Sequence, residues 1–246
     1  MTKRTGLVIA GALVAMLPLA AAYASITGSK HDLSSASSAA IKSSATDQIC
    51  IFCHTPHKAQ STQVLWNHTA SLNSTISWGG VTQTSGGTLL PTTVNTRSMR
   101  CLSCHDGSVA LGDVTNFAGT AAILPMTGPA GTIDGTGKLT DSYYIMGASG
   151  NLGGNHPIGI PYPGQAAGQY NGRASGSLVN ATEYVAAATI TGSVTPTVKL
   201  FADTTNPSVL GIECGSCHDV HNSQNLTAFL WKSNAASALC LSCHIK

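Results

Sequence analysis

Four short motifs account for every cysteine of this 246-residue chain, and all four have the same form. Two cysteines are separated by two residues, and a histidine follows the second cysteine directly. A pattern repeated four times with no cysteine left over requires a fold that holds thiols and imidazoles together in sets. The motifs are Cys50-Cys53-His54, Cys101-Cys104-His105, Cys214-Cys217-His218 and Cys240-Cys243-His244.

The spacing is that of covalent c-type haem attachment. Two thiols about one helical turn apart can each bond one vinyl group on the same edge of the macrocycle. The next residue then places an imidazole under the iron as its proximal ligand. We therefore predict four covalently bound haem c groups, with the eight cysteines as attachment points. The predicted proximal iron ligands are His54, His105, His218 and His244.

Three other uses of paired cysteines explain the pattern less well. Four disulfides are common in exported proteins, yet disulfides do not need a histidine after each pair. Zinc bound by two Cys-x-x-Cys pairs also leaves the four histidines without a role. A thioredoxin-like redox motif is expected once, in a βαβ unit, whereas this chain repeats its motif in glycine-rich surroundings.

The first residues have the form of an export signal. Lys3 and Arg4 precede an apolar run, and Ala22-Tyr23-Ala24 is a small-x-small cleavage site. A membrane anchor would need about 20 apolar residues without such a site. We predict a signal peptide over residues 1–24 and an exported mature chain over residues 25–246. Its expected location is extracellular or on the cell surface, with the periplasm as the alternative.

Charged residues make up only 9% of the chain and aromatic residues 5%. Two of the twelve Lys and Arg residues lie in the predicted signal, which leaves ten against ten Asp and Glu. This balance excludes the basic footprint of nucleic-acid binding. A protein-only core would be thin, so we expect haems to supply apolar volume. The predicted fold class is a multihaem cytochrome c, mostly irregular, with short helices near the motifs and a few short strands, for example in "ATITGSVTPTVKL".

Five histidines remain once the proximal ligands are assigned, enough to give every iron a second imidazole with one left over. His57 and His221 each follow a proximal histidine by three residues. If the chain is helical there, each lies on the proximal side of its own haem and must reach a different iron. His156 and His31 complete the predicted distal set, and His68 is expected to make a surface or propionate contact, with ligation only a possibility. Alternative axial ligands are Met99, Met126 and Met146.

The motif order contains an internal repeat. The stretches "CIFCHTPHKAQSTQVLW" and "CGSCHDVHNSQNLTAFLW" share Cys-x-x-Cys-His-x-x-His and a later Leu-Trp offset by one residue, and "CLSCH" follows each of them. The repeat predicts two di-haem modules, about 46–118 and about 210–246, on either side of a Gly- and Thr-rich insert, about 119–209. Trp66 and Trp231 are expected to pack against haem faces.

The stretches "SKHDLS", "ICIFCHTPHKA", "CLSCHDGSVALG", "NHPIG" and "CGSCHDVHN" together resemble one family. It is the tetrahaem c-type cytochromes with doubled CxxCH motifs on the outer surface of metal-reducing microbes, including members that polymerise into extracellular filaments. The resemblance implies little regular secondary structure around closely packed haems. It also implies that one haem takes its distal histidine from the adjacent subunit, for which His31 is the expected residue. An open contact of that kind gives a fibre rather than a closed ring.

The function we expect is electron transfer without catalysis, as a conductive filament subunit or as a soluble periplasmic carrier. The implied partners are further copies of the chain, other multihaem cytochromes and external acceptors such as metal oxides. A multihaem reductase of a small oxyanion would need an iron with an open position beside proton donors, whereas here histidines exceed the demand. A surface adhesin or haem-storage protein is a third possibility.

Overall fold

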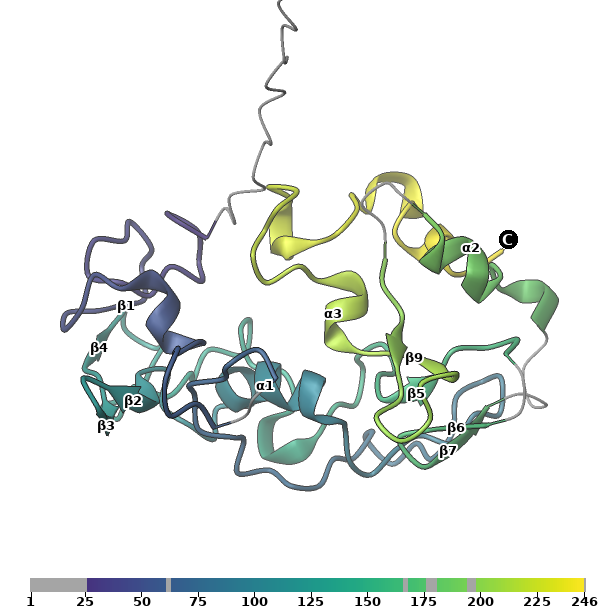
Figure 1. The fold of residues 1–246 in the computed structure, drawn as a ribbon, viewed down its shortest axis with the longest axis horizontal. Coiled ribbons are helices and arrows are strands. Elements are labelled where there is room, and N and C mark those ends of the chain that lie inside the picture. The colour runs from purple at the N-terminus through teal and green to yellow at the C-terminus, as the bar shows by residue number, and fades with distance from the viewer. Residues whose placement is uncertain (1–25, 61–62, 166–167, 176–180, 194–197, 246) are drawn as a thin grey trace, which may run out of the picture.

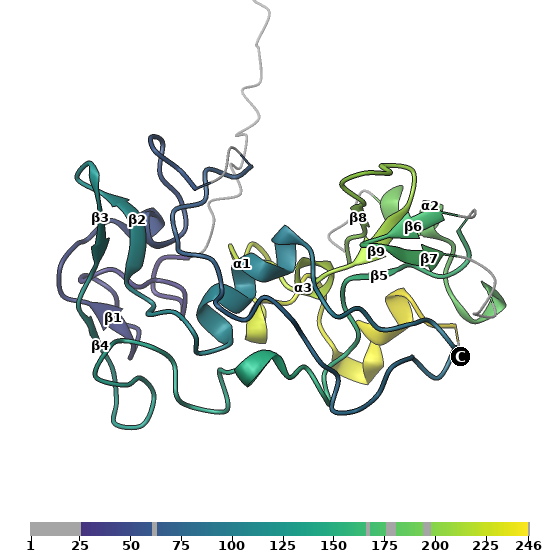
Figure 2. The ribbon, with the colours of Figure 1, turned by 90° about the horizontal axis from the view of Figure 1, so that it is seen from below.

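The computed structural model describes residues 26–60, 63–165, 168–175, 181–193 and 198–245. The predicted signal peptide, residues 1–24, lies outside the described residues. Within them the chain is elongated, with strands β1 to β4 at one end and strands β5 to β9 with helix α2 at the other (Figures 1 and 2). Helices α1 and α3 lie between the two ends in both views.

Helices are short, as the sequence predicts. The α-helices are α1 (Thr96–His105), α2 (Ala187–Thr191) and α3 (Cys214–Cys217). The 3-10 turns are η1 (Ile49–Phe52), η2 (Ala148–Gly150), η3 (Ala181–Glu183), η4 (Thr227–Phe229), η5 (Ala235–Ser237) and η6 (Cys240–Ser242). In the part of the chain that the structure covers, no helix is long and apolar enough to cross a membrane.

Strands form small antiparallel sheets, and irregular backbone dominates between them. The strands are β1 (Lys42–Ser43), β2 (Asp113–Phe117), β3 (Thr120–Ile123), β4 (Met126–Thr127), β5 (Ile160–Pro161), β6 (Gly168–Tyr170), β7 (Arg173–Ser175), β8 (Phe201–Ala202) and β9 (Leu210–Ile212). Their pairings are β1 with β4, β2 with β3, β6 with β7, and β9 between β5 and β8. The prediction of a mostly irregular chain with few short elements is therefore confirmed.

One strand prediction was wrong. The stretch "ATITGSVTPTVKL", residues 188–200, contributes its first residues to α2 rather than to a strand, and residues 194–197 lie outside the described residues. Tertiary packing explains the difference, because Ile190 of α2 is buried beside Tyr162 and Val198. Alternation of apolar residues over four positions cannot distinguish a strand from a single turn of helix.

Each attachment motif lies on or beside a short helix. The longest, α1, begins where the Asn95 side chain accepts a hydrogen bond from the backbone N–H of Arg97, a typical N-cap. It ends at His105, and Gly107 then takes a left-handed conformation with φ of 70°. The remaining motifs use η1, α3 and η6, in which the cysteine spacing of three closes one turn. In this way short-range geometry presents both thiols of a motif on the same side.

Three separate hydrophobic clusters replace a single core within the described residues. The largest surrounds Leu102 of α1 and includes Ile76, Trp78 and Leu152. A second joins Phe52 of η1 to Val114 and Leu124, and the third surrounds Tyr162. Each cluster is small for a chain of this length, which agrees with the expectation that protein side chains alone supply little apolar volume.

Candidate haem-binding sites

The eight thiols are unpaired, and none of them is buried. Free cysteine is normally among the most buried residue types, so eight accessible thiols point to a role at a surface or recess. Cys53 combines solvent exposure with a pKa that burial raises to about 12, which places this thiol in a recess lined by protein. Disulfides are absent among these cysteines, and no described cluster of three or more His, Cys, Asp or Glu residues could hold a metal such as zinc.

Successive motifs adjoin one another in the order of the sequence. Cys53 of the first motif is close enough to Cys104 of the second for its pKa to respond, after the larger effect of burial. Cys101 lies within hydrogen-bonding reach of Cys214, a contact that raises the pKa of Cys101. Burial and then the neighbouring Cys243 raise the pKa of Cys217 to about 11. The four motifs therefore form a row in which each has its sequence neighbours beside it.

The first motif of each pair is closed by a short local loop. The Nδ1 atom of His54 lies 2.5 Å from the carbonyl oxygen of Val64, and that of His218 lies 2.8 Å from the carbonyl oxygen of Ala228. Both acceptors come ten residues after the histidine. Val64 and Ala228 have positive φ values of 54° and 57°, unusual for residues with a Cβ. The two loops thus repeat the same strained backbone, and the internal repeat extends to conformation.

The two tryptophans do not occupy equivalent places in this repeat. The backbone of Trp66 forms an isolated antiparallel β-bridge with that of His54. In the second module the residue that forms such a bridge with His218 is Leu230. The backbone N–H of Trp231 bonds the carbonyl oxygen of Cys217, as that of Asn67 bonds Cys53. Counted from the proximal histidine, Trp231 therefore corresponds to Asn67, and the shared Leu-Trp letters are offset in structure as in sequence. Trp66 Nε1 is buried with no protein partner, whereas Trp231 Nε1 donates to the Gly215 carbonyl oxygen at 2.9 Å.

The second motif of each pair is held by the Gly- and Thr-rich insert. His105 Nδ1 lies 2.8 Å from the carbonyl oxygen of Tyr144, and the N–H of Met146 donates to the His105 carbonyl oxygen. His244 pairs through the backbone with Tyr184, whose ring centre lies 5.0 Å from the imidazole. No sequence signal marked Tyr144 or Tyr184 as site residues, because the contacts join segments far apart in the chain.

Hydrogen bonding fixes the tautomer of these imidazoles. A carbonyl oxygen has no proton to give, so Nδ1 of His54, His105 and His218 must carry the proton and donate it. The Nε2 atom then keeps its lone pair, which is the arrangement that a metal-binding imidazole needs. The observed geometry of all three residues fits proximal ligation of iron.

Three pairs of imidazoles have their ring centres at nearly the same separation, with interplanar angles of 55°, 24° and 71°. The ring centres are 6.1 Å apart for His31 and His105, 6.3 Å for His54 and His221, and 6.4 Å for His156 and His244. An imidazole nitrogen lies about 2 Å from a bound metal, and the ring centre about 1 Å further, so two rings on one metal are about 6 Å apart. Each pair joins a predicted proximal to a predicted distal histidine and fits a bis-histidine iron.

His31 lies against its own chain. Its ring stacks on Phe229 at 4.5 Å and lies tilted by 55° to the ring of His105. Burial, followed by the charge of His105, lowers the pKa of His31 to about 4. The imidazole is therefore neutral at physiological pH, as a ligand must be. This placement favours ligation within the subunit, and it does not support His31 as the residue donated to a neighbour.

The fourth motif-borne imidazole, His218, belongs to none of these three pairs, although it lies near enough to His31 and His105 for its charge to lower their pKa values. His57 is exposed, and its carbonyl oxygen accepts hydrogen bonds from Thr55 and Asn116. The chain after His54 does not continue as a helix, because the Thr55 N–H bonds the Leu65 carbonyl oxygen instead. His57 therefore points from a loop, and its predicted ligation of another iron stays a prediction.

His68 is fully buried, both of its ring nitrogens lie against backbone carbonyl oxygens, and its Nε2 also lies 3.4 Å from Cys104 Sγ. Its Nδ1 lies 2.8 Å from the Thr69 carbonyl oxygen, and its Nε2 lies 3.0 Å from that of Ala110. The expectation of a surface position was wrong, since the ring is enclosed between β2 and α1 segments. Two of the alternative axial methionines, Met99 and Met126, pack against the hydrophobic clusters. Their positions therefore do not favour either methionine over a histidine as the axial iron ligand.

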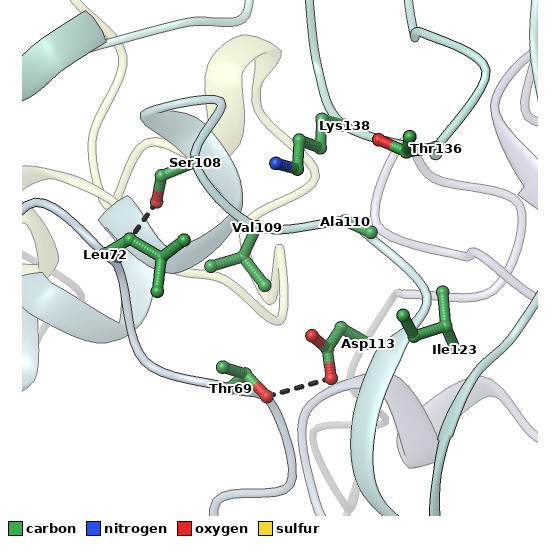
Figure 3. Close-up of a pocket in the computed structure, with 9 residues that line it drawn as sticks. All are labelled: Thr69, Leu72, Ser108, Val109, Ala110, Asp113, Ile123, Thr136 and Lys138. Carbon is green, nitrogen blue, oxygen red and sulfur yellow. Dashed lines mark hydrogen bonds between the residues drawn. The ribbon is translucent and has the colours of Figure 1, made fainter.

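A separate pocket of about 260 Å³ lies beside the second motif (Figure 3). Thr69 donates to Asp113 at one side, and the Leu72 N–H donates to Ser108 at another. Lys138 extends into the space between these groups. The pocket contains no histidine or cysteine, so it does not belong to the row of attachment motifs.

Residues 207–246 match the family described as the doubled CXXCH motif. The match supports a multihaem c-type cytochrome. It covers the third and fourth motifs, and Cys214 within it lies in hydrogen-bonding reach of Cys101 on α1, outside the matched residues. The motifs imply covalently bound c-type haem, and the accessible thiols and facing imidazoles described above fit that group. No curated protein matches the chain.

Proposed function

We propose that this multihaem cytochrome carries electrons through four covalently bound, bis-histidine-ligated haems and polymerises into an extracellular conductive filament. Each bound haem supplies an iron that accepts and releases one electron. The protein attaches and orients these groups, holds their ligands in one tautomer and keeps the four sites in a row. The observation that carries the proposal is the set of three facing imidazole pairs with one motif-borne imidazole, His218, left to find its partner elsewhere.

The repeat indicates where that partner comes from. His221 of the second module faces His54, the first motif-borne imidazole of the other module. His57 occupies the same position in the first module, and the repeat-related target of His57 is His218. Within one chain His57 does not face His218, so we assign the contact to a second copy. His57 of one subunit then completes the iron site of His218 in the next, a head-to-tail contact that gives an open fibre when the rotation between subunits does not close a ring.

The row of motifs supports electron transfer over catalysis. An oxyanion reductase needs a permanently open iron position beside proton donors, whereas the proposed assembly gives each iron two imidazoles. The chain is proposed to act at the cell surface, with other multihaem cytochromes as donors and external acceptors such as metal oxides. The alternative is a soluble periplasmic carrier, in which the His218 iron would have one protein ligand.

Spin state and microscopy together test this proposal. Dilute wild-type subunits should show one high-spin haem in four by electron paramagnetic resonance, and that signal should disappear as filaments form in negative-stain images. His57→Ala should attach every haem yet remain as discrete particles with the high-spin signal. Gln60→Ala, which alters an exposed side chain in the same loop, is the matched control and should still polymerise. Wild-type protein that stays as discrete particles at all concentrations would favour the soluble carrier.

A further inference from the structure

A buried carboxyl group lies where the second and third attachment motifs meet. Glu213 immediately precedes Cys214, is only 1% exposed, and contacts α1, which carries Cys101. The Cys214 N–H also donates to Ser98 of α1 at 3.1 Å, so the carboxyl sits inside the α1–α3 contact. A buried carboxylate is costly unless it is well hydrogen-bonded or paired, and no opposite charge contacts Glu213 directly in the described residues.

Three side chains enclose the carboxyl group with donors. Tyr170 donates to Oε1 at 2.7 Å and Asn95 donates to the same oxygen at 2.5 Å, while the Ser98 hydroxyl donates to Oε2. Ser98 and Tyr170 are themselves fully buried. Only one oxygen can carry a proton at a time, and the hydroxyls can then reverse their direction. The cage can therefore hold the carboxyl group either ionised or protonated.

The charges around this group are few. Arg97 on α1 is the nearby cation, and its Nη1 donates to the Ala202 carbonyl oxygen rather than to Glu213. The titratable neighbours are Tyr170 and the thiols of Cys101 and Cys214, which haem attachment would convert to uncharged thioethers. Burial raises the pKa of Glu213 to about 7, against the hydrogen bonds from Ser98 and Tyr170 and the charge of Arg97, which lower it.

We propose that Glu213 binds one proton when a haem on the adjoining second or third motif is reduced, and that it releases this proton on oxidation. The proposal rests on the proposed function for the electron, which arrives from the preceding carrier in the row. The proton comes from water and adds to a carboxylate oxygen, and no bond between heavier atoms forms or breaks. Reduction removes one positive charge beside the carboxylate, and the protonated form becomes more favourable.

Linkage makes the effect reciprocal. A protonated Glu213 no longer stabilises the oxidised, more positive state, so the affected haem becomes easier to reduce at low pH. Its midpoint potential should fall as pH rises through the range around neutrality, by at most about 59 mV for each tenfold change in proton concentration. Below and above that range the potential should be constant, because Glu213 is then protonated or ionised in both redox states.

Spectroelectrochemical titration of the full haem-loaded chain at several pH values tests this inference. In the wild-type protein the midpoint potential of one haem should depend on pH. In Glu213→Gln the midpoint potential of that haem should stay at its low-pH value across the whole pH range. The reduced-minus-oxidised infrared spectrum should contain a protonated-carboxyl band that Glu213→Gln abolishes. Asp134→Asn, which alters an exposed carboxylate that caps its own turn, is the matched control and should behave as wild type.

A second variant keeps the test informative if Glu213→Gln folds poorly. Tyr170→Phe removes one donor to the carboxylate, so the pH-dependent range should move upward without disappearing. A pH dependence that survives Glu213→Gln unchanged, or an unmoved range in Tyr170→Phe, would overturn the proposal. A redox-active but pH-independent wild type rejects the proton step alone, whereas a protein with no reducible haem rejects the proposed function as well.

Discussion

The ring centre of His31 lies 6.1 Å from that of His105 within one subunit. The resemblance to filament-forming cytochromes implied that His31 would be the residue given to a neighbour. The fold instead stacks His31 on Phe229 and encloses it beside the second motif. Among the described residues, His57 is the only exposed histidine that belongs to none of the three imidazole pairs, and its contact with a neighbouring subunit stays a proposal.

Each facing histidine should matter for the spin state of one haem. Replacing His31, His156 or His221 by Ala removes one of two imidazoles from a site, so dilute subunits should contain two high-spin haems in four, one more than the wild type, while all remain covalently attached. Electron paramagnetic resonance reports the spin state and denaturing mass spectrometry counts the haems. Gln60→Ala, at an exposed position, should leave the spin state unchanged. A His31→Ala protein with wild-type spectra would show that its pairing with His105 is not ligation.

Asn67 should be a strong contributor to stability in the first module. Its fully buried amide donates to the carbonyl oxygens of Ile51 and Asn116 and accepts from the Asn116 N–H at 2.8 Å. Asn67→Ala leaves buried backbone groups without partners and should lower the free energy of unfolding by about 2–4 kcal/mol. Denaturant titration followed by circular dichroism measures this loss. Asn155→Ala removes an exposed amide and should change the value by about 0.5 kcal/mol or less.

His68 should make the folded state sensitive to acid. Burial lowers its pKa below the usual 6.5, against hydrogen bonds to Thr69 and Ala110 that raise it. The unfolded chain therefore binds the proton first, and stability falls as pH drops from about 6.5 towards the lowered folded-state pKa. His68→Asn removes this titration, so its free energy of unfolding should depend less on pH in that range. Parallel pH curves for the two proteins would contradict the prediction.

Gly211 should tolerate no side chain. A Cβ at this position would lie 2.4 Å from the Tyr170 ring, which is itself fully buried beneath β9. Gly211→Ala must displace the tyrosine and should cost about 1–3 kcal/mol of stability. Gly135→Ala is the matched control, since nothing lies within 4 Å of its Cβ position. Equal melting temperatures for the two variants would show that Tyr170 can move aside freely.

The sequence predicted the elements of the sites that depend on local chemistry. Cysteine spacing and the adjacent histidine determine one turn of backbone, and all four motifs lie on or beside such a turn. The scarcity of aromatic residues also indicated that no large protein core would form, and the structure has three small clusters instead.

The remaining features could not be predicted because they depend on tertiary contacts. His54 and His218 are held by backbone carbonyls in left-handed loops, and a carbonyl leaves no mark in a side-chain pattern. The roles of Tyr144 and Tyr184 require the insert to fold back on the motifs. The shared Leu-Trp letters suggested that the two tryptophans are equivalent. In the structure, however, the repeat equivalent of Trp231 is Asn67, because the backbone conformation depends on the distance from the histidine rather than on residue identity.

The pairing of His54 with His221 also sets an order of assembly. The first attachment motif leaves the ribosome early, whereas the residue that faces its imidazole belongs to the last part of the chain. Contacts between such distant segments carry a high entropic cost of loop closure and slow folding. A truncated chain that ends before residue 210 should therefore leave its earliest site incomplete. The first site is therefore completed only after the distant segment that carries His221 has folded against it.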